Sequence, residues 1–230
     1  MEITLLVNQY KKYFLKGLQQ DLKCYSELSY DELIKNVSFA LTSSNPSSRI
    51  EERKFDKKQR HQMRRTEKTL DSLYGKLSSI KDKLLSKKNN KCTFEELYEY
   101  IADEIYLGEN KINGVGPLFL YDTALRIGAY FEILPKNRVF IHSGAEVGLK
   151  YLLKLQLKKG NILDERSIDM RDIVNDELLK LKACYIEDFL CVYKDGNLKE
   201  GVEIKNYCHD IDDDPNGKEE RVARRLGQCH

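Results

Sequence analysis

The chain has 230 residues, of which 41% are hydrophobic and 33% are charged, and its formal net charge is +2. This length and apolar content suffice for a folded core in one large domain or two small ones. No apolar run approaches the roughly 20 residues that span a bilayer, and residues 1–3 do not open a signal peptide, so we expect a cytoplasmic protein without a membrane partner.

The N-terminal segment has the apolar spacing of helices. Apolar residues recur at steps of three and four between Ile3 and Leu22, which predicts an amphipathic helix with one buried side. Ser29 and Glu32 have the spacing of a capping box, which predicts the start of a second helix. The run 42–48, which contains Pro46, is expected to end that helix.

A long polar helix is predicted from Ile50 to about Lys88. Its first half has few apolar residues, so we expect this half to project into solvent or to lie against a partner. Basic residues fall near one side of it at helical spacing, and they are either phosphate contacts or a soluble helix surface. These candidate contacts are Lys57, Arg60, Arg64, Arg65 and Lys68.

Charge is distributed unevenly along the chain. Residues 49–91 contain 15 Lys and Arg against 6 Asp and Glu, a net charge of +9, whereas residues 161–220 contain 8 basic and 17 acidic residues, a net charge of −9. Such segregation favours a basic face for a polyanion, although two solvated helical surfaces would give the same pattern.

A second capping box, Thr93 to Glu96, predicts a helix that continues through Ile105 and ends before Gly108. The segment Ile112 to Pro117 then interrupts the apolar pattern, and a new apolar helix pattern runs from Leu118 to Phe131. A Gly-x-Gly turn at a helix start leaves backbone N–H groups uncovered, and these groups suit a phosphate oxygen. Gly114, Val115 and Gly116 are therefore candidate nucleic-acid contacts.

About residues 94–131 resemble the helix-hairpin-helix nucleic-acid-binding superfamily. Gly114 and Gly116 match the two hairpin glycines of that superfamily, and Val115 matches the apolar residue between them. The resemblance implies that the hairpin amides hold a DNA phosphate largely independently of sequence. Leu120 stands where the superfamily usually has a small residue, and Asn113 where it typically has proline. The alternative is a glycine-rich turn that joins two core helices.

Residues after the apolar helix carry a possible catalytic pair. Arg138 to Ile141 are expected to form a strand, and Ser143 to Glu146 a third capping box for a further helix. His142 could act as a base with Asp122 as its orienting carboxylate, which would fit a small hydrolase or nuclease. Asp122 also has the spacing for an ion pair with Arg126, and no complete catalytic motif is present, so the catalytic residues stay unknown.

The last third is acidic, with a helical apolar pattern between Ile168 and Val192 and a polar tail at 196–230. The six cysteines are scattered, and we expect free thiols. Zinc on the pairs 208–209 and 229–230 is disfavoured because adjacent side chains rarely point at the same ion. Calcium on the acidic run 210–217 is disfavoured because Pro215 interrupts the loop and Ala223 stands in place of the bidentate glutamate. We therefore expect no metal and no cofactor.

These patterns predict a mainly α, multi-helix globular protein with a long polar helix and at most a short strand or hairpin. The expected regions are an N-terminal helical region (1–91), a central helical core with the Gly-x-Gly junction (92–195) and a polar tail (196–230). The expected function is nucleic-acid binding without sequence specificity, with DNA favoured over RNA. The alternative is a protein-interaction or self-association module that uses the 50–88 helix.

Overall fold

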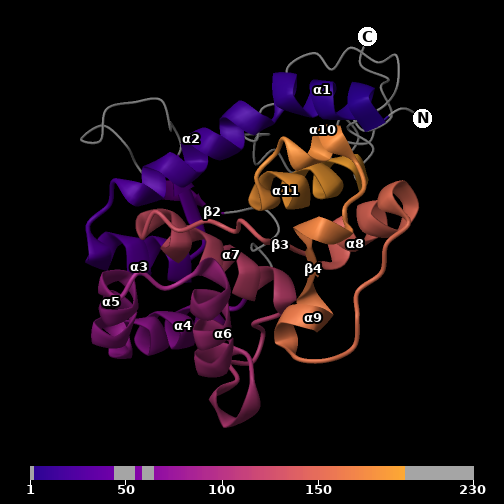
Figure 1. The fold of residues 1–230 in the computed structure, drawn as a ribbon. Helices are drawn as coiled ribbons and strands as arrows, with labels where there is room; N and C mark the ends of the chain where they lie inside the picture. Colours follow the sequence, from indigo (N-terminus) through magenta and orange to yellow (C-terminus); the bar gives the residue numbers. More distant parts are fainter. Residues whose placement is uncertain (1–2, 44–54, 59–64, 195–230) are drawn as a thin grey trace. The chain divides into compact units, whose positions relative to one another are not determined.

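A computed structural model describes residues 3–43, 55–58 and 65–194, and the ribbon in Figure 1 shows them as a chain of mostly short helices. Strands occupy few of these residues and form two separate two-stranded antiparallel sheets. The expected mainly α, multi-helix fold class is confirmed. The polar tail at 196–230, with its Cys-His pairs and its acidic run, lies outside the described residues.

Contacts divide the chain into two compact units. The first unit comprises residues 1–19 together with 136–230, and the second comprises residues 20–135. The division falls inside helix α2 (Leu15–Ser26), and the second unit runs across the boundary expected near residue 91. Each candidate site described below lies within one unit.

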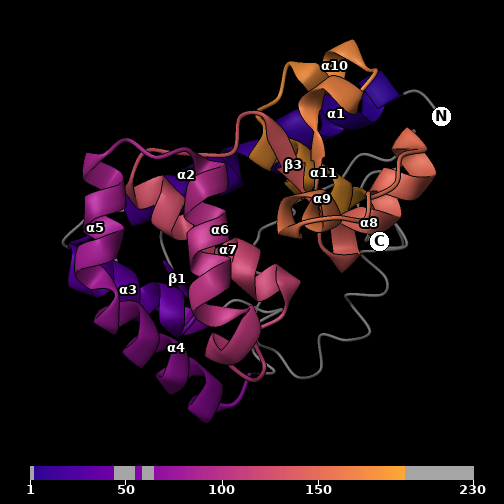
Figure 2. The same cartoon turned by 60° about the horizontal axis from the view of Figure 1, so that its bottom comes forward.

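The second unit is a layered set of helices, in which α6 packs on α7, α3 packs on α4 and on α7, and α4 contacts α6. Figure 2 shows α4, α6 and α7 close together. Its elements after α2 are α3 (Tyr30–Ser38), β1 (Leu41–Ser43), β2 (Phe55–Lys58), α4 (Glu67–Ser79), α5 (Lys81–Asn89), α6 (Phe94–Ile105), the 3-10 turn η3 (Gly108–Asn110) and α7 (Pro117–Tyr130).

Two of the expected capping boxes start helices of this unit. The side chain of Ser29 accepts the backbone N–H of Glu32 at the start of α3, and the Glu32 carboxylate accepts the N–H of Ser29. Thr93 and Glu96 make the same reciprocal pair at the start of α6. Both satisfy N–H groups that a helix leaves without partners in its first turn.

The expected single helix over 50–88 was wrong. Residues Phe55–Lys58 form β2, which pairs antiparallel with β1, and the helical part is divided into α4 and α5 at Ile80. Leu70 of this segment is only 2% exposed and belongs to the core of its own unit. A surface for self-association on residues 50–88 would therefore have to use other side chains.

The first unit is built around α11. This helix packs on α8 and on β3, and it also contacts α1, while β3 pairs with β4. The elements are α1 (Ile3–Tyr13), β3 (Arg138–Phe140), α8 (Ser143–Gly148), the π-helical turn η4 (Leu149–Leu153), α9 (Ile162–Arg166), β4 (Ser167–Asp169), the 3-10 turn η5 (Met170–Asp172), α10 (Asp176–Leu179) and α11 (Ala183–Lys194).

The expected strand at 138–141 is confirmed by β3. Ile168, expected in a helix, lies instead in β4, where it pairs with Val139. The expected N-terminal helix is interrupted at Phe14, between α1 and α2.

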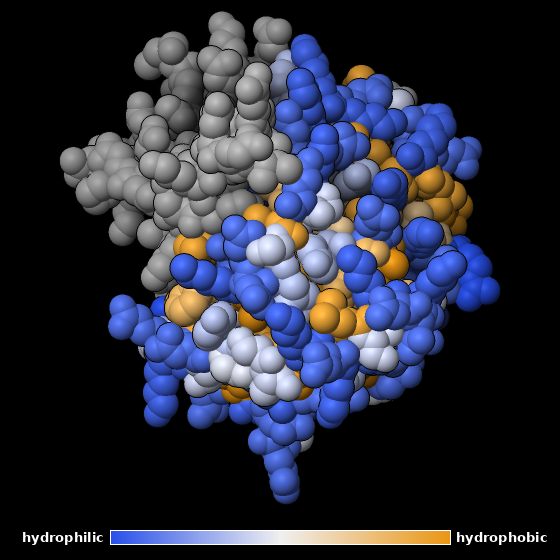
Figure 3. Space-filling view, turned by 90° about the vertical axis from the view of Figure 1, so that its left-hand side faces the viewer, coloured by the Kyte–Doolittle hydropathy of each residue, from blue (hydrophilic) through white to orange (hydrophobic). Residues whose placement is uncertain are grey.

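The surface is polar where Figure 3 shows it, with hydrophobic residues scattered between hydrophilic ones, as is usual for a surface that faces water. Among the described helices, none combines the length and the apolar character that a bilayer span requires.

Candidate functional site

The Gly-x-Gly segment forms the entry to α7. Gly114 has a φ of +92°, a conformation that residues with a Cβ rarely adopt. The N–H of Val115 donates to the carbonyl of Ile112 over 3.1 Å, and the Val115 side chain is buried. Gly116 is the N-cap of α7 and offers no side-chain cap, while Pro117 takes the first helical position. The first turn of α7 therefore starts without a capping side chain.

Helix α4 holds this junction in place. The Thr69 hydroxyl donates to the Asn113 carbonyl over 2.9 Å, and it also lies 3.0 Å from the hydroxyl of Thr66, the N-cap of α4. A Cβ atom placed on Gly114 would lie 2.7 Å from Thr69 Oγ1. Glycine is thus required at position 114 both by its backbone conformation and by the close approach of α4.

We expect Gly114→Ala to lower the free energy of unfolding by about 2 kcal/mol, because alanine is strained at positive φ and its methyl group would collide with Thr69. Gly75→Ala is the matched control, since Gly75 lies inside α4 with no other atom within 4 Å of an added Cβ. The control should instead stabilise by about 0.5–1 kcal/mol. Urea denaturation of both variants measures the difference, and equal effects would contradict the role given to Gly114.

The structure places the side chain of Arg65, one of the candidate basic residues, beside the junction. Its guanidinium carbon lies 5.7 Å from the centre of the Phe119 ring. Its Nη2 atom lies 3.9 Å from the position that a Cβ on Gly116 would occupy. Arg65 and Gly116 are half-buried, and Gly114 is exposed. A cation and an uncapped helix start therefore share one part of the surface.

The other basic candidates have different outcomes. Lys68 is exposed in the first turn of α4. Lys57 belongs to β2, where its backbone pairs with Thr42, so it does not continue a helical stripe toward Arg65. Arg60 and Arg64 lie outside the described residues.

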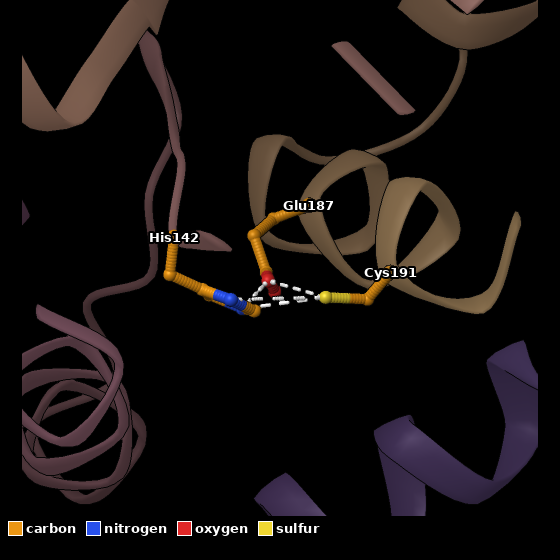
Figure 4. A group of neighbouring side chains, drawn as sticks. All are labelled: His142, Glu187 and Cys191. Carbon is orange, nitrogen blue, oxygen red and sulfur yellow. Dashed lines mark hydrogen bonds and ion pairs between the residues drawn. The ribbon is translucent and has the colours of Figure 1, made fainter. Parts of the chain in front are cut away.

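A second cluster, in the first unit, was not expected from the sequence. It consists of His142, Glu187 and Cys191, whose side chains point at one another in Figure 4. His142 Nε2 contacts Glu187 Oε1 in a short ion pair or hydrogen bond. Cys191 Sγ lies 3.4 Å from His142 Nε2 and 3.6 Å from Glu187 Oε1. A nitrogen, an oxygen and a sulfur ligand atom therefore face one small volume.

Two elements bring this cluster together. His142 follows β3 and is the N-cap of α8, where its Nδ1 accepts the N–H of Gly144 over 3.3 Å. The expected cap, Ser143, is instead the first residue of the helix, because the His142 ring takes the capping role. Glu187 and Cys191 lie one turn apart on α11 and so face the same side of it.

Glycines allow α8 and α11 to approach closely. A Cβ on Gly148 would lie 2.8 Å from the Leu190 carbonyl oxygen, and a Cβ on Gly144 would lie 2.8 Å from Cys191 Sγ. These two glycines are one helical turn apart and face α11. His142 and Glu187 are 9% and 5% exposed, and Cys191 is half-buried. The cluster is therefore largely shielded, and Cys191 is its most exposed residue.

His142 and Asp122, the possible catalytic pair, each have another partner. His142 pairs with Glu187, whereas Asp122 makes the expected i,i+4 ion pair with Arg126, with 3.6 Å between Oδ1 and Nη1. Asp122 belongs to the second unit and His142 to the first. Sequence spacing could not have found Glu187, since no short motif links it to His142.

Comparison with protein-family models, with curated proteins and with solved structures finds no match for this chain.

Proposed function

We propose that the protein binds nucleic acid through phosphate contacts at the start of α7, without sequence specificity and with DNA favoured over RNA. The observation that carries this proposal is the position of Arg65 beside Gly116. The two residues were separate candidates in the sequence, and Arg65 lies just before α4 whereas Gly116 is the N-cap of α7. A phosphate at this point would meet a guanidinium and the uncapped first turn of α7 together.

The chemistry of the junction suits a phosphate. The partial positive charge of a helix N-terminus favours an anion, and the absence of a side-chain cap on α7 leaves room for one. Guanidinium groups bind phosphate through two parallel hydrogen bonds, which are stronger than neutral ones. Lys68 is exposed in the first turn of α4, shortly after Arg65 in the chain, and adds a second positive charge at the start of α4. Lys57, Arg60 and Arg64 stay predictions.

The proposal predicts binding to a duplex DNA of random sequence at about 50 mM salt, with an affinity that falls linearly on a logarithmic scale as salt rises. Fluorescence anisotropy with a labelled duplex measures both. Arg65→Ala should weaken binding about tenfold and reduce the salt slope by about 1, because one phosphate contact is lost. A duplex RNA of the same sequence tests the preference for DNA.

Lys88→Ala is the matched control. Lys88 also stacks on an aromatic ring, with its Nζ 4.3 Å from the centre of Tyr130 at the opposite end of α7, a helix of 14 residues and hence about 20 Å. This variant removes a stacked cation but no proposed phosphate contact. Undetectable binding at low salt, or equal losses in the two variants, would contradict the proposal. Thermal unfolding of both variants checks that neither has lost its fold.

The alternative proposal is a protein partner, or a second copy of this chain, on residues 50–88. Its test is sedimentation of the pure protein, which should then show a stable dimer. We also propose a cytoplasmic location, and the absence of a disulfide among the described cysteines, Cys24, Cys92, Cys184 and Cys191, fits a reducing compartment.

A further inference from the structure

We propose that His142, Glu187 and Cys191 bind a zinc ion. Imidazole nitrogen, carboxylate oxygen and thiolate sulfur are the three kinds of ligand atom that zinc takes in proteins. The three atoms lie within 4.8 Å of one another. Three protein ligands would leave the fourth tetrahedral position to a water molecule. This site is independent of the proposed nucleic-acid contacts, which belong to the other unit.

Two of the three distances between the ligand atoms fit a tetrahedral zinc site. Bond lengths of about 2.0–2.1 Å to nitrogen and oxygen and about 2.3 Å to sulfur place tetrahedral ligand atoms about 3.3–3.6 Å apart. The observed distances from Cys191 Sγ are 3.4 Å to His142 Nε2 and 3.6 Å to Glu187 Oε1. The third pair, His142 Nε2 and Glu187 Oε1, is in direct contact, and the distance between these two atoms would have to increase by about 1 Å to admit the ion.

The hydrogen bonds around His142 define the form without metal. The N–H of Gly144 donates to Nδ1, so in the neutral ring the proton is on Nε2 and is donated to Glu187. Zinc would take the place of this proton on Nε2. The imidazole then carries its proton on Nδ1, which gives up the Gly144 bond, and the Cys191 thiol releases its proton to solvent. One proton is therefore released for each zinc ion bound.

Charge also favours zinc at this place. The carboxylate of Glu187 and the thiolate of Cys191 together carry two negative charges, which a divalent cation neutralises, and the imidazole is neutral. The resulting centre has no net charge, which suits a cluster in which His142 and Glu187 are buried. The close crossing of α8 and α11 at Gly144 and Gly148 holds the two helices that flank the site, so that the adjustment falls on the His142 and Glu187 side chains.

Titration of the full chain with Co²⁺ tests the proposal, because cobalt bound to a thiolate in a tetrahedral site gives a sulfur-to-metal charge-transfer absorption and intense visible bands. We expect one equivalent of Co²⁺ per chain, displaced by Zn²⁺. Cys191→Ser should abolish the charge-transfer absorption, and Glu187→Gln and His142→Gln should each weaken binding more than tenfold. In Glu187→Gln the amide oxygen can still accept the His142 N–H. This variant therefore removes the carboxylate ligand but keeps the hydrogen bond that supports the fold.

Two controls separate this site from other thiols. Cys184 lies on the same helix, and burial, aided by the charge of Glu187, raises the pKa of its thiol to about 12. Cys184→Ser should therefore leave Co²⁺ binding unchanged. The double variant Cys208→Ser, Cys229→Ser should likewise keep the absorption. Loss of cobalt binding in that double variant, or full binding in Cys191→Ser, would overturn the proposal, as would binding of less than half an equivalent by the unaltered chain.

Discussion

Replacing Phe189 by alanine is expected to lower the free energy of unfolding of the first unit by about 4 kcal/mol. Phe189 lies on α11 and has no exposed surface. Its ring meets Tyr10 of α1 edge to face, with 5.7 Å between the ring centres, and Tyr10 in turn stacks on Phe14. The truncation would leave a cavity in the contact between α1 and α11, and would remove an aromatic pair that contributes beyond its buried area.

Equilibrium unfolding in urea measures this loss as a shift of the transition midpoint. Phe189→Leu is the graded control, because leucine fills much of the space and should cost less than half as much. Val174→Ala is the surface control, since Val174 is 98% exposed and its truncation should change stability by less than about 0.5 kcal/mol. A loss below about 1 kcal/mol for Phe189→Ala would mean that α1 does not depend on this contact.

Local signals in the sequence predicted helix starts well. Ser29 and Thr93 begin helices because each satisfies N–H groups only three residues away, and this geometry does not depend on the rest of the chain. Helical spacing likewise predicted the ion pair between Asp122 and Arg126, one turn apart on α7. Interactions within one or two helical turns are therefore predictable from spacing.

Non-local pairing explains the main error in the fold. Residues 55–58 were assigned to a helix, but they form a strand because β1 offers a partner, with Phe55 opposite Ser43. Nothing within the segment itself indicates that partner, and strand preference depends more on the neighbouring strand than on intrinsic propensity. The break between α4 and α5 at Ile80 could not be predicted from the sequence either, since no glycine or proline lies at that position.

The two candidate sites differ in how far the sequence could predict them. The Gly-x-Gly junction has a local pattern, and only its contact with Arg65 and Thr69 required the fold. The cluster at His142 has no such pattern, because its thiol lies 49 positions away and its carboxylate on the same distant helix. The sequence does show that Glu187 and Cys191 lie one helical turn apart. This spacing indicates a site only once the fold places His142 opposite these two side chains.

Replacing Asp122 by alanine is expected to lower the free energy of unfolding of the second unit by about 3 kcal/mol. Asp122 and Arg126 are each 7% exposed. The Arg126 Nε–H donates to the Tyr25 hydroxyl over 3.0 Å, and that hydroxyl donates to the Leu41 carbonyl over 2.5 Å. Without the carboxylate, the buried guanidinium would lose its ion-pair partner. Its unbalanced charge would then weaken the chain of hydrogen bonds that joins α7 to α2 and β1.

A double-mutant cycle separates the ion pair from the packing. Arg126→Met alone should also destabilise, because it removes the cation that pairs with a buried carboxylate, whereas Asp122→Ala with Arg126→Met removes both charges together. We expect the double variant to lose at least about 1 kcal/mol less than the sum of the single losses, as measured by urea unfolding. Strictly additive losses would show instead that each side chain stabilises the unit through separate neighbours, and that the pairing of charges on α7 contributes nothing of its own.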